Sequence, residues 1–118
     1  MQSKAKPATK EERSRMRRVN EIGCLACLKK GIKSGPAENH HLLDGGRRRG
    51  HRFTIGLCGY HHAGRFPEGV DRKEFRHRMG PALTDGTKLF RMMFGTDDEL
   101  LKLQDDLIEY HGPTQSTR

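Results

Sequence analysis

In the last quarter of the chain, apolar residues recur three and four positions apart, which predicts the buried face of an amphipathic helix. The residues of this face are Leu100, Leu103, Leu107 and Ile108. Thr96, followed three positions later by Glu99, forms the capping-box pattern at which such a helix begins. Gly112-Pro113 is a pair at which it ends.

A second capping box predicts a basic helix near the N-terminus, after a disordered tail over residues 1–7. Thr9 and Glu12 form the box, and the helix continues to about Arg18. The inward contacts of this segment are predicted to be Met16, Val19 and Ile22.

Two further helices are predicted between these. Asp71 with Glu74 caps one that ends at Gly80-Pro81, and another covers about 87–94 and ends at Gly95. None of the helices predicted after residue 70 carries residues that indicate a catalytic function. We therefore interpret this C-terminal segment as a structural cap.

The stretch 24–57 has turn signals in place of helical periodicity. Two short strands are predicted within it, at about Asn39–Leu43 and Phe53–Leu57, joined by the loop Asp44–His51. The expected structure is a hairpin whose tip is rich in glycine and arginine.

Composition indicates that this fold needs a source of stability beyond its core. Of the 118 residues only 32% are hydrophobic, and Trp is absent. Domains of this size with thin cores often depend on a metal or a disulfide. Three cysteines cannot form a closed set of disulfides, so metal ligation is favoured.

Charge indicates a polyanionic partner. The formal net charge is +8, and residues 1–52 hold fourteen Lys and Arg against five Asp and Glu. Such an excess is typical of nucleic-acid binding. No stretch approaches the about 20 apolar residues of a membrane span, and no signal-peptide core follows the basic N-terminus. We expect a cytoplasmic monomer without membrane contact.

Two cysteine motifs predict a structural zinc site. Cys24-x-x-Cys27 is a zinc knuckle, and Cys58-x-x-His61 supplies the completing pair. A closed Cys₃His site would contribute folding free energy. The alternative is a pair of buried or redox-active thiols, although no thioredoxin-like context surrounds them.

Three histidines beside these motifs form a candidate catalytic site. His40 and His41 are neighbours in a strand, so their side chains point to opposite faces and perform different tasks. One would bind a catalytic cation together with His62, and the other would act as general base on water. Phosphodiester hydrolysis needs both functions. The alternative is that these histidines are merely packed or exposed.

The predicted hairpin tip is a candidate surface for phosphate groups. Guanidinium groups bind the phosphates of a nucleic-acid backbone in a bidentate manner. The candidates are Arg47, Arg48, Arg49 and Arg52, and the alternative is a solvated charged loop. His51, in the same loop, is a further candidate for reaching the catalytic metal.

The order of these motifs resembles the HNH (ββα-metal, His-Me finger) endonucleases in their zinc-ribbon form. Over about 19–109 the chain most resembles the Ref family of RecA-dependent HNH nucleases, found in phages and prophages. The similar stretches are 37–42, 45–48, 51–58, 61–64, 80–83 and 94–101.

The resemblance implies an α+β fold with a small ββα-metal core and zinc knuckle over 19–70. The basic tail and helix at 1–18 would precede the core, and the helical segment 71–118 would pack on it as one domain. It further implies a phage- or prophage-encoded enzyme that cuts DNA bound by RecA in the bacterial host cell.

The resemblance also implies individual roles. His41 matches the general base, and His62 matches a ligand of the catalytic divalent ion, which would be Mg²⁺, Mn²⁺ or Zn²⁺. His40 stands where many relatives place a metal-binding Asp. His61 stands where the second knuckle usually has a Cys, which supports a Cys₃His zinc site.

The sequence departs from the motif in two places. The middle Asn should fall near Phe53 or Thr54, so His51 or Thr54 is left as the candidate to orient the base. Gly64 and Pro67 leave room for little more than a turn where the metal-site helix usually follows.

Two other functions stay open. A non-catalytic, zinc-dependent DNA-binding module would share the knuckles and the arginine loop, but would not need His41 or His62. A colicin-type toxin nuclease would need a transport region, for which the chain is short.

Overall fold

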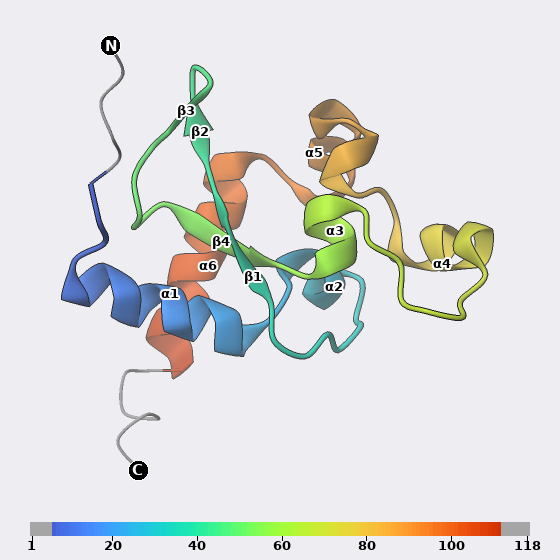
Figure 1. Cartoon of the computed structure of the whole chain (residues 1–118), viewed down its shortest axis with the longest axis horizontal. Coiled ribbons are helices and arrows are strands. Elements are labelled where there is room, and N and C mark those ends of the chain that lie inside the picture. Colours follow the sequence, from blue (N-terminus) through green and yellow to red (C-terminus); the bar gives the residue numbers. More distant parts are fainter. Residues whose placement is uncertain (1–5, 112–118) are drawn as a thin grey trace.

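The computed structural model describes residues 6–111, and the C-terminal stop predicted at Gly112-Pro113 and most of the predicted tail lie outside them. Within this part of the chain two helices precede a block of four short strands, and further helices follow it (Figure 1). The elements are α1 (Lys10–Ile22), α2 (Leu25–Lys29), β1 (Glu38–His41), β2 (Leu43–Asp44), β3 (Arg47–Arg48), β4 (Thr54–Leu57), α3 (Gly59–Ala63), α4 (Arg72–Met79), the 3₁₀ turn η1 (Leu83–Asp85), α5 (Thr87–Phe94) and α6 (Asp97–His111).

The β structure consists of two antiparallel pairs. β1 pairs with β4, and His41 lies opposite Thr54. β2 pairs with β3 to form a small second hairpin. The prediction of a plain loop over Asp44–His51 is therefore wrong. Gly45 and Gly46 both have positive φ angles, of 56° and 86°, which the central residues of a type I′ hairpin turn require.

Helix caps confirm the predicted helices. Thr9 and Glu12 form both hydrogen bonds of the capping box of α1, which extends four residues beyond the predicted end at Arg18. Asp71 caps α4, and α5 has the bounds 87–94 that the pattern predicts. Periodicity did not reveal α2 and α3, because five residues are too few to show it.

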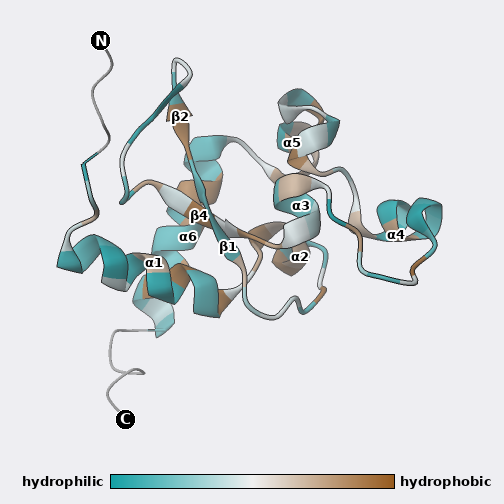
Figure 2. Cartoon of the chain, in the orientation of Figure 1, coloured by the Kyte–Doolittle hydropathy of each residue, from teal (hydrophilic) through white to brown (hydrophobic). Residues whose placement is uncertain are grey.

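The core lies around the β1–β4 pair. Helices α1 and α6 pack on this pair, and the short helices α2 and α3 also contact it (Figure 1). β4 is coloured mainly hydrophobic in Figure 2, whereas most of α1 is hydrophilic. The largest fully buried apolar side chains are Val19, Leu25, Leu42, Ile55, Leu57 and Leu100. No helix among residues 6–111 has the length and apolar character needed to cross a membrane.

The buried face of α6 matches the prediction only in part. Leu100 is buried, but Leu103, Leu107 and Ile108 are only partly buried, and the fully buried neighbour is Gln104. Its Oε1 accepts the backbone N–H of Gly56 at 2.7 Å. A polar side chain is favoured there because a strand N–H faces the helix and needs an acceptor.

We expect Gln104→Leu to lower the free energy of unfolding by about 1–3 kcal/mol, because it leaves the buried N–H of Gly56 without an acceptor. Urea unfolding monitored by circular dichroism measures the effect. Lys102→Ala on the exposed side of the same helix is the control and should stay within about 0.5 kcal/mol of the unchanged chain. Equal stabilities for the two variants would show that this hydrogen bond is unimportant.

Candidate functional site

Four potential metal ligands converge at the starts of α2 and α3, with their ligand atoms all within 4.8 Å of one another. From Nδ1 of His61, the sulfur atoms of Cys24, Cys27 and Cys58 lie 3.4, 3.6 and 3.3 Å away, and the last two sulfurs are 3.9 Å apart. Ordinary zinc–ligand bonds at tetrahedral angles place such S–N pairs at about 3.6 Å and S–S pairs at about 3.8 Å. The predicted Cys₃His set can therefore hold one tetrahedral metal ion.

The local backbone explains why these ligands point inward. Cys24 and Cys58 are the N-caps of α2 and α3, and their sulfur atoms accept hydrogen bonds from the N–H groups of Cys27 and His61. Each motif is thus a capped helical turn that presents two ligands on one side. In the metal-free chain, hydrogen bonding with the Cys24 sulfur raises the pKa of Cys27 and lowers that of Cys58.

A backbone carbonyl selects the tautomer of His61. Nε2 of this fully buried ring donates a hydrogen bond of 2.9 Å to the carbonyl oxygen of Met79, so Nδ1 keeps its lone pair toward the sulfurs. Phe94 packs against the same ring at 5.3 Å between centroids. Three of the four potential ligands are buried and Cys58 is partly buried, as suits a structural metal site with no open position for substrate.

A second group of side chains lies between β1 and α3. The rings of His40 and His62 meet edge to face, with centroids 5.1 Å apart. Nδ1 of His62 lies 2.7 Å from Oε1 of Glu38, and the other oxygen of Glu38 accepts a hydrogen bond from Arg65. A carboxylate that accepts the Nδ1–H of a histidine leaves Nε2 free to bind a metal. The sequence did not identify Glu38, because its partner is 24 residues away.

His41 points to the other face of β1, as predicted from strand geometry. Its Nε2 lies 3.2 Å from Nδ1 of His51, and Nε2 of His51 lies 2.7 Å from the carbonyl oxygen of Lys6. Thr54, the other predicted candidate to orient the base, instead uses its hydroxyl to bind Asn39 and Arg15.

Both strand histidines favour the neutral form. Burial, and then the neighbouring His62, lowers the pKa of His40 to about 4. The pKa of His41 is also lowered, first by burial and then by the charge of Arg48. Neutral imidazole is the form that binds metals and accepts protons, so both residues retain that capacity at neutral pH.

Residues after position 80 line the hollow beside His40 and His62, so this segment does more than cover the core. A cleft of about 300 Å³ opens at His40 and His62, and its other walls come from β2, η1, α5 and the start of α6. Arg91 and Asp97 bring charge to the cleft and form an ion pair of 3.3 Å. The remaining lining residues are Leu43, Leu83, Thr84 and Thr87.

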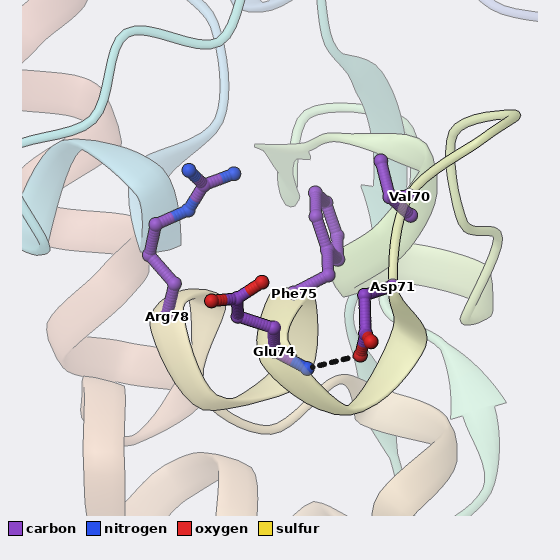
Figure 3. Close-up of a pocket in the computed structure, with 5 residues that line it drawn as sticks. All are labelled: Val70, Asp71, Glu74, Phe75 and Arg78. Carbon is purple, nitrogen blue, oxygen red and sulfur yellow. Dashed lines mark hydrogen bonds between the residues drawn. The ribbon is translucent and has the colours of Figure 1, made fainter.

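Another hollow, of about 380 Å³, lies beside α4 and contains none of the predicted site residues (Figure 3). Asp71 bonds the backbone N–H of Glu74 there as the helix cap, and Val70, Phe75 and Arg78 complete the walls. In Figure 1, α4 lies at the end of the molecule opposite α1. The hollow is formed by the Asp71 cap and the first turns of α4, and it is separate from the candidate site.

The four predicted phosphate-binding arginines are not equivalent. Arg47 and Arg48 are exposed on β3. Arg49 is held by Asp98 at 2.9 Å and by Asp44 at 3.4 Å. Arg52 is exposed in the loop before β4. Arg47, Arg48 and Arg52 are therefore the ones that present an exposed guanidinium.

Comparison with known proteins adds one match. The model of the family described as "Recombination enhancement, RecA-dependent nuclease" matches residues 8–109. That range includes the four potential zinc ligands, the histidines of the cleft and the second hairpin. No curated protein matches the chain.

Proposed function

Because the chain belongs to the recombination-enhancement, RecA-dependent nuclease family, we propose that it is a metal-dependent HNH endonuclease that cuts DNA in the context of a RecA filament. The family supports a nuclease role in recombination, with DNA as substrate. We propose in addition that the chain acts by the HNH mechanism and that individual histidines have specific roles in it.

The observation that carries the HNH assignment is the arrangement of three histidines on β1 and α3. β1, its antiparallel partner β4 and α3 supply two strands followed by a helix, with His41 at the end of the first strand and His62 in the helix. His40 and His62 meet at an open cleft, and His41 is the next residue of β1, with its ring on the opposite face of the strand. A module that only binds DNA would not need this cluster.

The proposed chemistry divides among these side chains. His40 and His62 would hold a divalent cation, which supplies neutralisation of the charge that develops on the phosphate and the leaving oxygen. His41 accepts a proton from the attacking water at Nδ1, so that the water oxygen bonds to phosphorus while the bond to the leaving sugar oxygen breaks. His51 takes the orienting role of the missing Asn by bonding Nε2 of His41. Two imidazole ligands favour Zn²⁺ or Mn²⁺ over Mg²⁺.

The Cys₃His site would hold a structural Zn²⁺, and the exposed arginines of β3 and the following loop would bind the DNA backbone. The zinc proposal is supported by ligand distances that suit a tetrahedral ion and by the buried His61. The arginine proposal is supported by exposure: Arg47 and Arg48 extend from the hairpin, whereas Arg49 is already paired.

A nicking assay tests the proposed function. Supercoiled and single-stranded DNA are incubated with the chain and Mg²⁺, Mn²⁺ or Zn²⁺, with and without RecA and ATP. We expect cleavage that depends on a divalent ion and is enhanced by RecA. If DNA is bound but never cut under any of these conditions, the chain is a zinc-dependent DNA-binding module. Cleavage at the same rate with and without RecA would support the HNH mechanism and contradict a role for the RecA filament.

We expect Glu38→Ala to lower the cleavage rate and the affinity for the catalytic ion by about 10-fold to 100-fold, the usual effect of removing a carboxylate that orients a metal-binding histidine. Single-turnover kinetics over a Mn²⁺ titration measures both. Glu68→Ala, in an exposed loop, is the matched control and should behave as the unchanged chain. Unaltered metal dependence in Glu38→Ala would mean that His62 is not held for metal binding.

A further inference from the structure

We propose that the backbone carbonyl of Lys6 completes the catalytic base. In this view, the segment before α1 is the last acceptor of a hydrogen-bond relay through His51 to His41, and it determines which nitrogen of His41 faces the attacking water. The inference rests on the proposed function for the role of His41, but the relay itself is a property of the folded chain.

The direction of the relay follows from its last member. A carbonyl oxygen only accepts hydrogen bonds, so Nε2 of His51, at 2.7 Å from Lys6, carries the hydrogen. Neutral His51 then has its lone pair on Nδ1, and this atom accepts the hydrogen of Nε2 of His41 at 3.2 Å. Nδ1 of His41 is left with the lone pair, which is what a general base needs.

The lead-in segment is fixed firmly enough to serve as such an acceptor. Thr9 and Glu12 exchange both capping-box bonds, at 2.9 and 3.1 Å, and Arg13 donates a bond of 2.8 Å to the carbonyl of Ala8. Pro7, between this anchored turn and Lys6, has a restricted φ. The position of the Lys6 carbonyl is therefore tied to the start of α1.

α1 is in turn tied to the strand pair that carries the base. Arg15 donates to the hydroxyl of Thr54 at 2.9 Å and to its carbonyl at 3.1 Å, and Thr54 is the residue opposite His41 in β4. The same helix thus holds both the acceptor of the relay and the strand beside the base. A hollow of about 370 Å³ between the lead-in and β3 is lined by Lys6, His41, Arg48 and His51, and it leaves the base accessible from that side.

Through the relay, the N-terminal segment would orient the ring of His41, and this role does not depend on the charge of the segment. Lysine side chains before α1 would add affinity for DNA, which appears in the binding constant. Loss of a backbone carbonyl that orients the base would instead lower the cleavage rate of the protein–DNA complex. These two contributions can be separated by experiment.

Deletion of residues 1–7 removes the carbonyl, whereas deletion of residues 1–5 keeps it. Single-turnover cleavage is measured at saturating DNA, with DNA affinity and zinc content measured in parallel. We expect the 1–7 deletion to lower the rate by about 10-fold to 100-fold, a part of the ~10²–10⁴-fold that a positioned general base contributes. The 1–5 deletion should retain the rate and show only weaker DNA binding. Equal rates in the two deletions, or equal losses in both, would overturn the relay.

The tautomer of His41 in the full-length chain is the second measurement, and it requires neither a deletion nor activity. In ¹⁵N-labelled, zinc-loaded protein without a second metal, long-range ¹H–¹⁵N spectra identify which ring nitrogen carries the hydrogen. We expect the hydrogen on Nε2 of both His41 and His51. A hydrogen on Nδ1 of His41 would overturn the relay even if the chain cuts DNA. The expected tautomers in a chain that cuts no DNA would keep the relay and reject the proposed function.

Discussion

Removal of zinc by a strong chelator, or the substitution Cys24→Ser, is expected to unfold the chain. The ligand set joins α2 to α3 across more than thirty residues, and Cys24, Cys27 and His61 are almost completely buried. Structural zinc contributes about 10–16 kcal/mol in small zinc-binding peptides, which matches or exceeds the about 5–15 kcal/mol total stability of a typical domain. Only 32% of the residues in the chain are hydrophobic, so the small core that they form cannot replace that contribution.

Circular dichroism and zinc content by atomic absorption measure this result on the full chain. Ala26→Ser is the matched control, because it places a hydroxyl on the same buried helix without removing a ligand. We expect it to keep zinc and to lose only about 1–3 kcal/mol for the buried polar group. If Cys24→Ser kept both its fold and one equivalent of zinc, the Cys₃His assignment would be wrong.

His41→Ala is expected to lower DNA cleavage by about 10²–10⁴-fold, the range that a general base contributes. Zinc content and thermal stability should hardly change, because the ring is only half-buried and is not a ligand of the Cys₃His site. DNA affinity should also persist, since the exposed arginines remain. The expected variant is therefore a folded chain that binds DNA and does not cut it.

Single-turnover nicking, performed beside a DNA-binding measurement, tests this expectation. His77→Ala, which removes an exposed histidine from α4, is the matched control and should cut at the unchanged rate. Burial and the charge of Arg48 hold the pKa of His41 below its ordinary value of 6.5, so cleavage should fall on acidification only below that pH. A fully active His41→Ala would place the general base elsewhere and require a different mechanism.

Local signals predicted a large part of the fold. Thr9, Asp71 and Thr96 bond the N–H groups of nearby residues, so their helices could be recognised from a few consecutive positions. The four potential metal ligands can be recognised for the same reason, because each pair lies within one helical turn. The second hairpin was overlooked although its Gly-Gly turn was visible, because strands of two residues show no alternation.

Contacts between distant segments could not be predicted in this way. Glu38 orients His62, and Gln104 accepts the N–H of Gly56, yet nothing near these residues in the sequence indicates the partner. The segment 71–118 looked purely structural because Asp97 and Arg91 form ordinary helix patterns. Their presence in the cleft depends on the tertiary arrangement that brings α5 and the start of α6 beside His40 and His62.

Local sequence was enough to predict the capped helices, the four potential metal ligands and the placement of His40 and His41 on opposite faces of a strand. Each of these follows from hydrogen bonds or geometry within a few residues. Sequence patterns do not reveal that His51 rather than Thr54 meets His41, or that Lys6 meets His51. A ring with two hydrogen-bonding nitrogens pairs with whichever suitable group the folded chain brings within reach, and the packing of α1 on the strand pair brings Lys6 to His51.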